Sequence, residues 1–82
     1  MLGISLLSAE SQENYQLLLK FNNAEKKLLD MKPYLEKGVF QELKDVSYFR
    51  QVQTHANFVS WPHDQDLSLD TLYLRSTPVV ER

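Results

Sequence analysis

The chain has 82 residues and a mass of 9.6 kDa, enough for one domain near the lower size limit for independent folding. Hydrophobic residues make up 43% and charged residues 24%, which is typical of a globular protein. The lack of cysteine excludes disulfide scaffolds, thiolate zinc sites and cysteine nucleophiles, and the net charge of −2 disfavours nonspecific nucleic-acid binding. We therefore expect a single domain over residues 1–82.

The N-terminal segment predicts a leading strand and no targeting signal. Leu2 to Leu7 alternate weakly and indicate a strand, and the polar residues from Ser8 to Asn14 indicate a turn. The segment has no positive charge, its apolar run is too short for a secretory signal, and no stretch approaches the roughly 20 apolar residues of a membrane span. We expect a cytoplasmic protein without membrane contact.

The first hairpin has the strongest pattern in the chain. Tyr15 to Phe21 alternates with period two, which places Tyr15, Leu17, Leu19 and Phe21 on one face. A turn at Asn22-Asn23-Ala24 then leads into a second arm from Glu25 to Met31. Asparagine tolerates positive φ better than alanine, so we expect positive φ at one of the two asparagines and negative φ at Ala24.

The remaining residues predict short helices and a second hairpin. Proline at a first helical position, glycine at a helix end and small polar residues at N-caps supply the signals. We expect a helix over Pro33–Lys37 that ends at Gly38, and then an irregular connection anchored by Val39, Phe40 and Leu43. A second helix is expected over Val46–Arg50, capped by Asp45 and with Tyr48 and Phe49 pointing inward, and a hairpin of Val52–Thr54 and Phe58–Trp61 follows it. The last expected element is a helix over Leu69–Leu74, capped by Ser68, with Asp66 and Asp70 as further caps.

These elements predict an α+β fold: a small antiparallel sheet of two hairpins plus a leading strand, with short helices packed on one side. The helices are too short to be stable without packing onto the sheet. The core is expected to contain Tyr15, Leu17, Leu19, Phe21, Phe40, Leu43, Phe49, Val52, Trp61 and Leu72.

Candidates for catalysis or metal binding are few. His63, Asp64 and Asp66 share a polar loop and could offer imidazole and carboxylate ligands, but a metal site needs three or four convergent ligands. A solvated loop is the simpler interpretation. The only glycines are Gly3 and Gly38, so no glycine-rich phosphate loop exists. We predict no catalytic residue, no cofactor and no metal, and a protein that is not an enzyme.

Two further features have both a binding and a structural interpretation. Lys20, Lys26 and Lys27 flank the first hairpin and could combine with aromatic residues to hold single-stranded nucleic acid. We favour a structural interpretation, in which the aromatic residues are core and the lysines protect an exposed arm. Trp61 could be a binding hot spot, and we favour a structural anchor.

Several short motifs follow one another in a fixed order. They are Phe21-Asn22-Asn23-Ala24-Glu25, Asp30-Met31-Lys32-Pro33-Tyr34-Leu35, Gly38-Val39-Phe40 with Leu43 and Asp45, Tyr48-Phe49 with Val52, and Trp61-Pro62 with Asp66-Leu67, Asp70 and Leu72-Tyr73. In order and spacing they resemble a widespread bacterial domain-of-unknown-function family of small α+β proteins. The resemblance covers residues 15–73 and leaves 74–82 as a C-terminal tail. Members of that family usually have glycine where this chain has Ala24, and Asn-Gly where it has His63-Asp64.

Stand-alone members of that family resemble, by gene context, the antitoxin half of toxin–antitoxin pairs. The resemblance implies a non-enzymatic protein-interaction module that binds a small protein, such as a toxin encoded nearby. A small nucleic-acid-associated regulatory protein is the alternative. Unprotected sheet edges and a small core favour a homodimer when the partner is absent. We expect the partner-binding surface to include Lys26, Lys27, His63, Asp64, Val79 and Val80.

Overall fold

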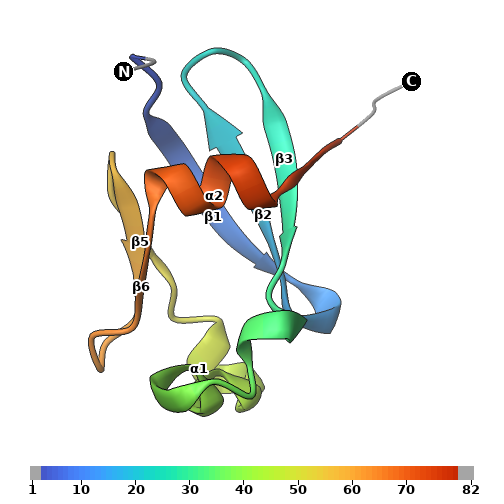
Figure 1. Cartoon of the computed structure of the whole chain (residues 1–82), viewed down its shortest axis with the longest axis vertical. Helices are drawn as coiled ribbons and strands as arrows, with labels where there is room; N and C mark the ends of the chain where they lie inside the picture. The colour runs from blue at the N-terminus through green and yellow to red at the C-terminus, as the bar shows by residue number, and fades with distance from the viewer. Residues whose placement is uncertain (1–2, 80–82) are drawn as a thin grey trace.

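Two antiparallel sheets form the fold, which the computed structural model describes over residues 3–79 (Figure 1). The larger sheet has the strand order β1-β2-β3-β7 and the smaller one the order β4-β5-β6. The predicted α+β class is confirmed, with two sheets where the sequence indicated one. The strands are β1 (Leu6–Gln12), β2 (Gln16–Phe21), β3 (Lys26–Asp30), β4 (Gln53–Thr54), β5 (Phe58–Ser60), β6 (Asp66–Ser68) and β7 (Thr77–Pro78); the α-helices are α1 (Val46–Phe49) and α2 (Leu69–Arg75), and the 3₁₀ helices are η1 (Glu13–Tyr15), η2 (Lys32–Tyr34) and η3 (Gly38–Lys44).

The hairpin of β2 and β3 confirms the clearest prediction from the sequence. Leu17 and Leu19 are fully buried and Phe21 is 1% exposed, so these three predicted residues point inward. Tyr15, the first residue of the predicted strand, lies in η1 instead and is partly buried. The strands pair with Leu17 opposite Leu29 and Leu19 opposite Lys27. A shift of the register by one residue would turn this whole apolar set outward, so burial of one face fixes the pairing.

The first strand lies further along the chain than the sequence indicated. β1 begins at Leu6 and continues to Gln12, so the polar segment from Ser8 is strand and the prediction of a turn there is wrong. Leu2 lies outside the described residues. Only Leu6 and Ala9 of β1 are buried, and a strand with so few inward apolar side chains has a weak hydrophobic pattern.

The second hairpin is confirmed, and a strand that was not predicted follows it. β4 pairs with β5 as expected, and β6 then adds to the other side of β5, in a segment that was interpreted as loop. Hydrogen bonds join β1 to β4 and the turn after it: the Leu6 amide donates to the Ala56 carbonyl at 2.9 Å, and the Ala9 amide donates to Thr54 Oγ1 at 3.0 Å. The small sheet therefore lies against the outer edge of β1.

The helix caps match their sequence signals, with one exception. The Asp45 side chain accepts from the Ser47 amide at 3.0 Å at the start of α1, and Ser68 accepts from the Thr71 amide at 3.4 Å at the start of α2. Asp70 lies in the first turn of α2 as expected. Asp66 lies in β6 instead, so its prediction as a cap is wrong. No helix within residues 3–79 is long and apolar enough to cross a membrane.

The expected helix at Pro33 is shorter than predicted, and the segment after it is more regular. η2 covers only Lys32–Tyr34, and η3 occupies the stretch that was expected to be irregular. Leu43 is fully buried there, but Val39 is 66% exposed, so its prediction as an anchor is wrong. The side chains in a 3₁₀ helix point in three directions, and those of such a short segment cannot all reach the core.

The core lies between the larger sheet, the smaller sheet and α2, which crosses one face of the larger sheet (Figure 1). Leu72 of α2 is fully buried against that face. Of the predicted core, seven members are buried and three are partly buried. The buried ones are Leu17, Leu19, Phe21, Leu43, Phe49, Trp61 and Leu72, and the partly buried ones are Tyr15, Phe40 and Val52.

The turn between β2 and β3 differs from the prediction. Ala24 has a φ of 72°, and neither asparagine is left-handed. The Ala24 amide donates to the Phe21 carbonyl and the Phe21 amide to the Glu25 carbonyl, which defines a three-residue loop with its last residue left-handed. Asn22 is held by Ser5, whose amide donates to Asn22 Oδ1 at 3.0 Å. The positive φ therefore falls on alanine.

The loop between β5 and β6 has the same geometry. The Asp64 amide donates to the Trp61 carbonyl, the Trp61 amide donates to the Gln65 carbonyl, and Asp64 has a φ of 73°. Ala24 and Asp64, the left-handed residues of these two loops, both stand where the resembling family has glycine. Aspartate tolerates this conformation better than alanine does, so of these two residues Ala24 is the more strained.

Candidate interaction surfaces

The predicted partner-binding residues divide between two parts of the molecule. Lys26 and Val79 lie together, because the Val79 amide donates to the Lys26 carbonyl at 2.9 Å. His63 and Asp64 lie in the loop between β5 and β6, on the opposite side of the view in Figure 1. Val80 lies outside the described residues. The structure does not bring these residues into one surface.

Lys27 is not on an exposed arm, and that expectation is wrong. Its side chain is 8% exposed, and its ammonium group donates to the Tyr73 carbonyl at 2.5 Å. The same Nζ lies 4.0 Å from the centre of the Tyr73 ring, a cation–π contact. The apolar stem of a lysine can fill core space while its charge finds a partner. Lys27 therefore fastens β3 to α2.

Glu25 and Tyr73 form a second link between the hairpin and α2. The Tyr73 hydroxyl donates to the Glu25 carboxylate, and Asn23 Nδ2 donates to the same oxygen at 2.5 Å. The hydrogen bond from Tyr73 lowers the pKa of Glu25, and the donation from Asn23 adds to the effect. The hydrogen bond to Glu25 raises the pKa of the Tyr73 hydroxyl. Two of the sequence motifs therefore meet in a structural contact.

The face of the larger sheet opposite α2 is a different kind of surface. Residues that alternate with the buried ones point to it, and the strand register arranges them in cross-strand rows. Leu18 lies opposite Leu28 in the middle row, and Lys20 lies opposite Lys26 in the next. Both leucines are partly buried, whereas Leu17 and Leu29 on the inner face are almost fully buried. This outer sheet face presents apolar groups between charged ones.

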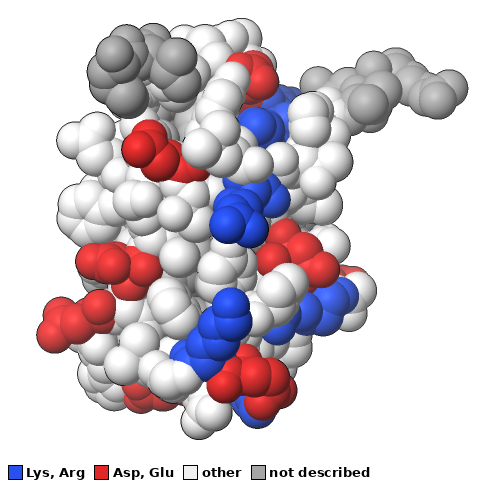
Figure 2. Space-filling view, in the orientation of Figure 1, with Lys and Arg blue, Asp and Glu red and all other residues white. Residues whose placement is uncertain are grey.

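The outer face of the smaller sheet contains an open hollow of about 630 Å³. Its lining residues are Gln53, His55, Phe58, Ser60, Trp61, Pro62, Asp64 and Asp66. The His55 and Phe58 rings stack with their centres 4.1 Å apart and their planes 10° from parallel. Acidic groups and no basic ones follow the left edge of the view in Figure 2, where Figure 1 places β5 and β6.

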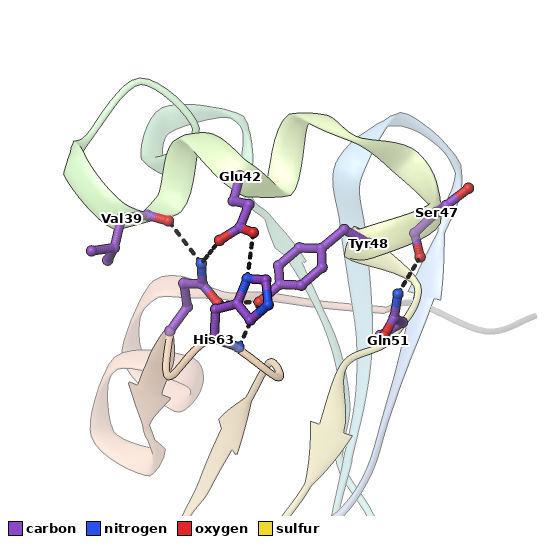
Figure 3. Close-up of polar contacts among 7 residues, drawn as sticks. Val39, Glu42, Ser47, Tyr48, Gln51 and His63 are labelled. Atoms are coloured by element: carbon purple, nitrogen blue, oxygen red, sulfur yellow. Dashed lines mark hydrogen bonds and ion pairs between the residues drawn. The ribbon is translucent and has the colours of Figure 1, made fainter.

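Gln65, which the sequence did not single out, is the buried centre of a polar cluster. Its partners Val39, Glu42 and Tyr48 are labelled in Figure 3. Gln65 is 2% exposed. Its Oε1 accepts from the Tyr48 hydroxyl at 2.6 Å, and its Nε2 donates to the Val39 carbonyl and to Glu42 Oε1, both at 2.9 Å. A buried amide needs such partners, and here they tie the loop between β5 and β6 to η3 and α1.

His63 belongs to the edge of the same cluster. Its Nδ1 contacts the Glu42 carboxylate, and its backbone amide donates to the Tyr48 hydroxyl at 2.8 Å (Figure 3). The imidazole therefore faces η3 and not the neighbouring Asp64 and Asp66. Within the part of the chain that the structure describes, no group of three histidine or acidic side chains is close enough to hold a metal ion.

Trp61 is a structural anchor, as the sequence favoured. It is 2% exposed, and its indole nitrogen donates to the Phe49 carbonyl at 3.0 Å. Its ring stacks on that of Phe49 at 6.2 Å between centres. A buried indole with a satisfied N–H contributes both packing and one hydrogen bond, so Trp61 joins β5 to α1 and is not a free contact residue.

Comparison with known proteins identifies one family. A sequence profile described as "Protein of unknown function (DUF2442)" matches residues 6–78. No curated protein and no solved structure matches the chain. The matched region begins at the first residue of β1 and ends at the last residue of β7, so it includes both sheets. The chain therefore belongs to the DUF2442 family of proteins of unknown function.

Proposed function

We propose that this chain is a non-enzymatic protein-interaction module that binds a small protein partner through the outer face of its larger sheet. One observation supports the proposal: the middle row of that face is apolar, with Leu18 opposite Leu28, and α2 packs on the other side of the sheet. Protein interfaces commonly have an apolar centre and a polar rim.

The charged residues on this face differ between the two sides of the leucine row. Lys20 lies opposite Lys26 on one side of the leucine row, and Gln16 lies opposite Asp30 on the other. Glu10 continues the leucine row onto β1. A partner with the complementary arrangement would approach in one orientation, because like charges across an interface oppose the reverse one. When the partner is absent, the same arrangement would allow a second copy of the chain, related by a twofold rotation, to bind to this face.

We further propose that the module acts as an antitoxin-like component, paired in the cytoplasm with a toxin encoded nearby. The resemblance to stand-alone family members with that gene context supports this role. In such a pair, the sheet face would neutralise its partner by covering a surface that the partner needs.

Co-expression with the product of the adjacent gene tests the proposal. The tagged chain should co-purify with that product and should relieve any growth inhibition that the product causes. Leu28→Glu should abolish both effects because it places a charge in the apolar row. Leu74→Glu on α2 is the matched control, since Leu74 is 74% exposed and lies on another element. Failure of the unaltered chain to co-purify, or full activity of a folded Leu28→Glu variant, would contradict the proposal.

The alternative, a small nucleic-acid-associated regulator, has some support on the same face. Lys20 and Lys26 lie directly opposite each other, but Lys27 points inward to Tyr73. Two lysines give a weak electrostatic footprint for a phosphate backbone. A mobility shift with single-stranded or duplex probes that disappears with salt and with Lys20→Gln would favour this alternative.

A further inference from the structure

We propose that the hollow on the outer face of the smaller sheet is a binding site for an arginine side chain in an extended segment of the protein partner. The inference rests on the proposed function in one respect, since it names the chemistry of a partner segment. It concerns a surface separate from the outer face of the larger sheet.

The strand register places the binding groups side by side. Ser60 of β5 lies opposite Gln53 of β4 on one side and opposite Asp66 of β6 on the other. Residues directly opposite each other in antiparallel strands have their Cβ atoms about 5 Å apart. Phe58, two residues before Ser60, points to the same face, and His55 stacks on it. The carboxylate of Asp66 therefore lies within a side-chain length of an aromatic pair.

The two carboxylates of the hollow have no partner among the residues that the structure describes. The side chains of Asp64 and Asp66 make no hydrogen bond or ion pair with any residue in 3–79. The chain has no lysine or arginine from residue 51 to residue 74, and none of the residues that line the hollow is a lysine or arginine. In Figure 2, acidic groups and no basic ones lie along the left edge of the view, where Figure 1 places β5 and β6. The charge of the hollow is thus complementary to a cation supplied by another molecule.

The open shape of the hollow and the stacked rings of His55 and Phe58 favour a guanidinium group over an ammonium group. Phe58 keeps 38% of its surface exposed although His55 covers part of it. A guanidinium group can stack on an exposed ring with its planar face and donate to carboxylates from its edge, whereas an ammonium group is compact and more strongly hydrated. The open hollow also admits the peptide backbone on either side of the arginine. Arginine is therefore the ligand that uses both the rings and the carboxylates.

A titration of the isotope-labelled full chain with short capped peptides tests the proposal by NMR. The probes are acetylated and amidated Gly-Arg-Gly-Arg-Gly and its lysine and citrulline counterparts. The arginine peptide should shift amide signals mainly within residues 53–68 and should bind more tightly than the lysine peptide. Asp66→Asn and Phe58→Leu should each weaken binding by about two- to fivefold, the range for an exposed ion pair and an exposed cation–π contact.

Asp70→Asn is the matched control, because it removes the same charge from the first turn of α2 and Asp70 does not line the hollow. It should leave the affinity within twofold of the unaltered chain. Equal binding of the lysine or citrulline peptide, or equal loss in Asp70→Asn and Asp66→Asn, would overturn the assignment to arginine. These results leave co-purification through the outer face of the larger sheet unaffected, so failure of this inference is distinguishable from failure of the proposed function.

Discussion

Replacing Ala24 by glycine should stabilise the protein, because Ala24 is held at a φ of 72°. An alanine in the left-handed region costs roughly 1–2 kcal/mol, since its Cβ approaches the following carbonyl oxygen. Glycine removes that cost but adds about 0.4–1 kcal/mol of conformational entropy to the unfolded chain. The difference between the two ranges is centred on an expected gain of about 0.8 kcal/mol in the free energy of unfolding.

Urea denaturation followed by circular dichroism measures this gain, and thermal unfolding gives an independent value. For a domain of this size, the expected increase in Tm is about 2–8 °C. The two backbone–backbone hydrogen bonds that close the turn and the side-chain hydrogen bonds of Asn23 do not involve the Ala24 side chain, so the substitution should leave the loop geometry unchanged.

Two matched variants separate relief of strain from a general effect of glycine. Ala56→Gly makes the same change at an exposed position with negative φ, and it should lose about 0.4–1 kcal/mol. Asp64→Gly makes the change at a φ of 73° and should gain less than Ala24→Gly, because aspartate tolerates that conformation. A loss of stability in Ala24→Gly equal to that in Ala56→Gly would refute the reasoning.

Three further predictions concern the core, the Glu25–Tyr73 contact and self-association. Leu19→Ala should lower the free energy of unfolding by about 2–5 kcal/mol, because Leu19 is fully buried; a much smaller loss in urea denaturation would contradict the inward face of β2. Tyr73→Phe removes the main cause of the lowered pKa of Glu25, so NMR titration should find that pKa closer to its ordinary value. A group whose pKa is lowered by folding stabilises the folded state at pH values above its pKa in the unfolded chain, and this stabilisation is lost as the pH falls through its pKa in the folded state. Tyr73→Phe should therefore also make the stability of the fold less sensitive to acid. An unchanged pKa of Glu25 in this variant would contradict the prediction. Light scattering of the isolated chain at high micromolar concentration should report a homodimer that Leu28→Glu converts to monomer, and a monomeric unaltered chain would count against it.

Local signals in the sequence predicted the elements whose causes are local. The period-two pattern around Leu17 and Leu19 identified the hairpin, because one buried face is enough to produce it. Asp45 and Ser68 identified the starts of α1 and α2, because an N-cap acts on amides only two or three residues away. In each case the residue and its effect lie within a few positions of each other.

Features that depend on distant residues could not be predicted in this way. Lys27 is buried where Tyr73 of α2, 46 residues later, accepts a hydrogen bond from its ammonium group through its backbone carbonyl and covers its charge with its ring. Gln65 resembles an ordinary loop residue until the fold brings Tyr48 and Glu42 to it. The φ of Ala24 depends on the three-residue loop that the pairing of β2 with β3 closes.

The hollow on the outer face of the smaller sheet is another feature that depends on residues distant in the sequence. The sequence places Asp64 and Asp66 near each other, but nothing local shows that His55 and Phe58 stack beside them. That juxtaposition comes from the pairing of β5 with β4 on one side and β6 on the other. The short strand β6, with Leu67 as its single buried side chain, has too little pattern to be detected.

The contact between the two sheets has a consequence for the behaviour of the protein at high concentration. An outer strand with free amides invites pairing with a strand of another molecule, the first step of aggregation. On β1 the amides of Leu6 and Ala9 are already taken by the Ala56 carbonyl and the Thr54 hydroxyl. The segment around β4 therefore acts as a shield for the edge of the larger sheet. If that segment detaches, the edge of β1 becomes available to foreign strands while most of the fold is still intact.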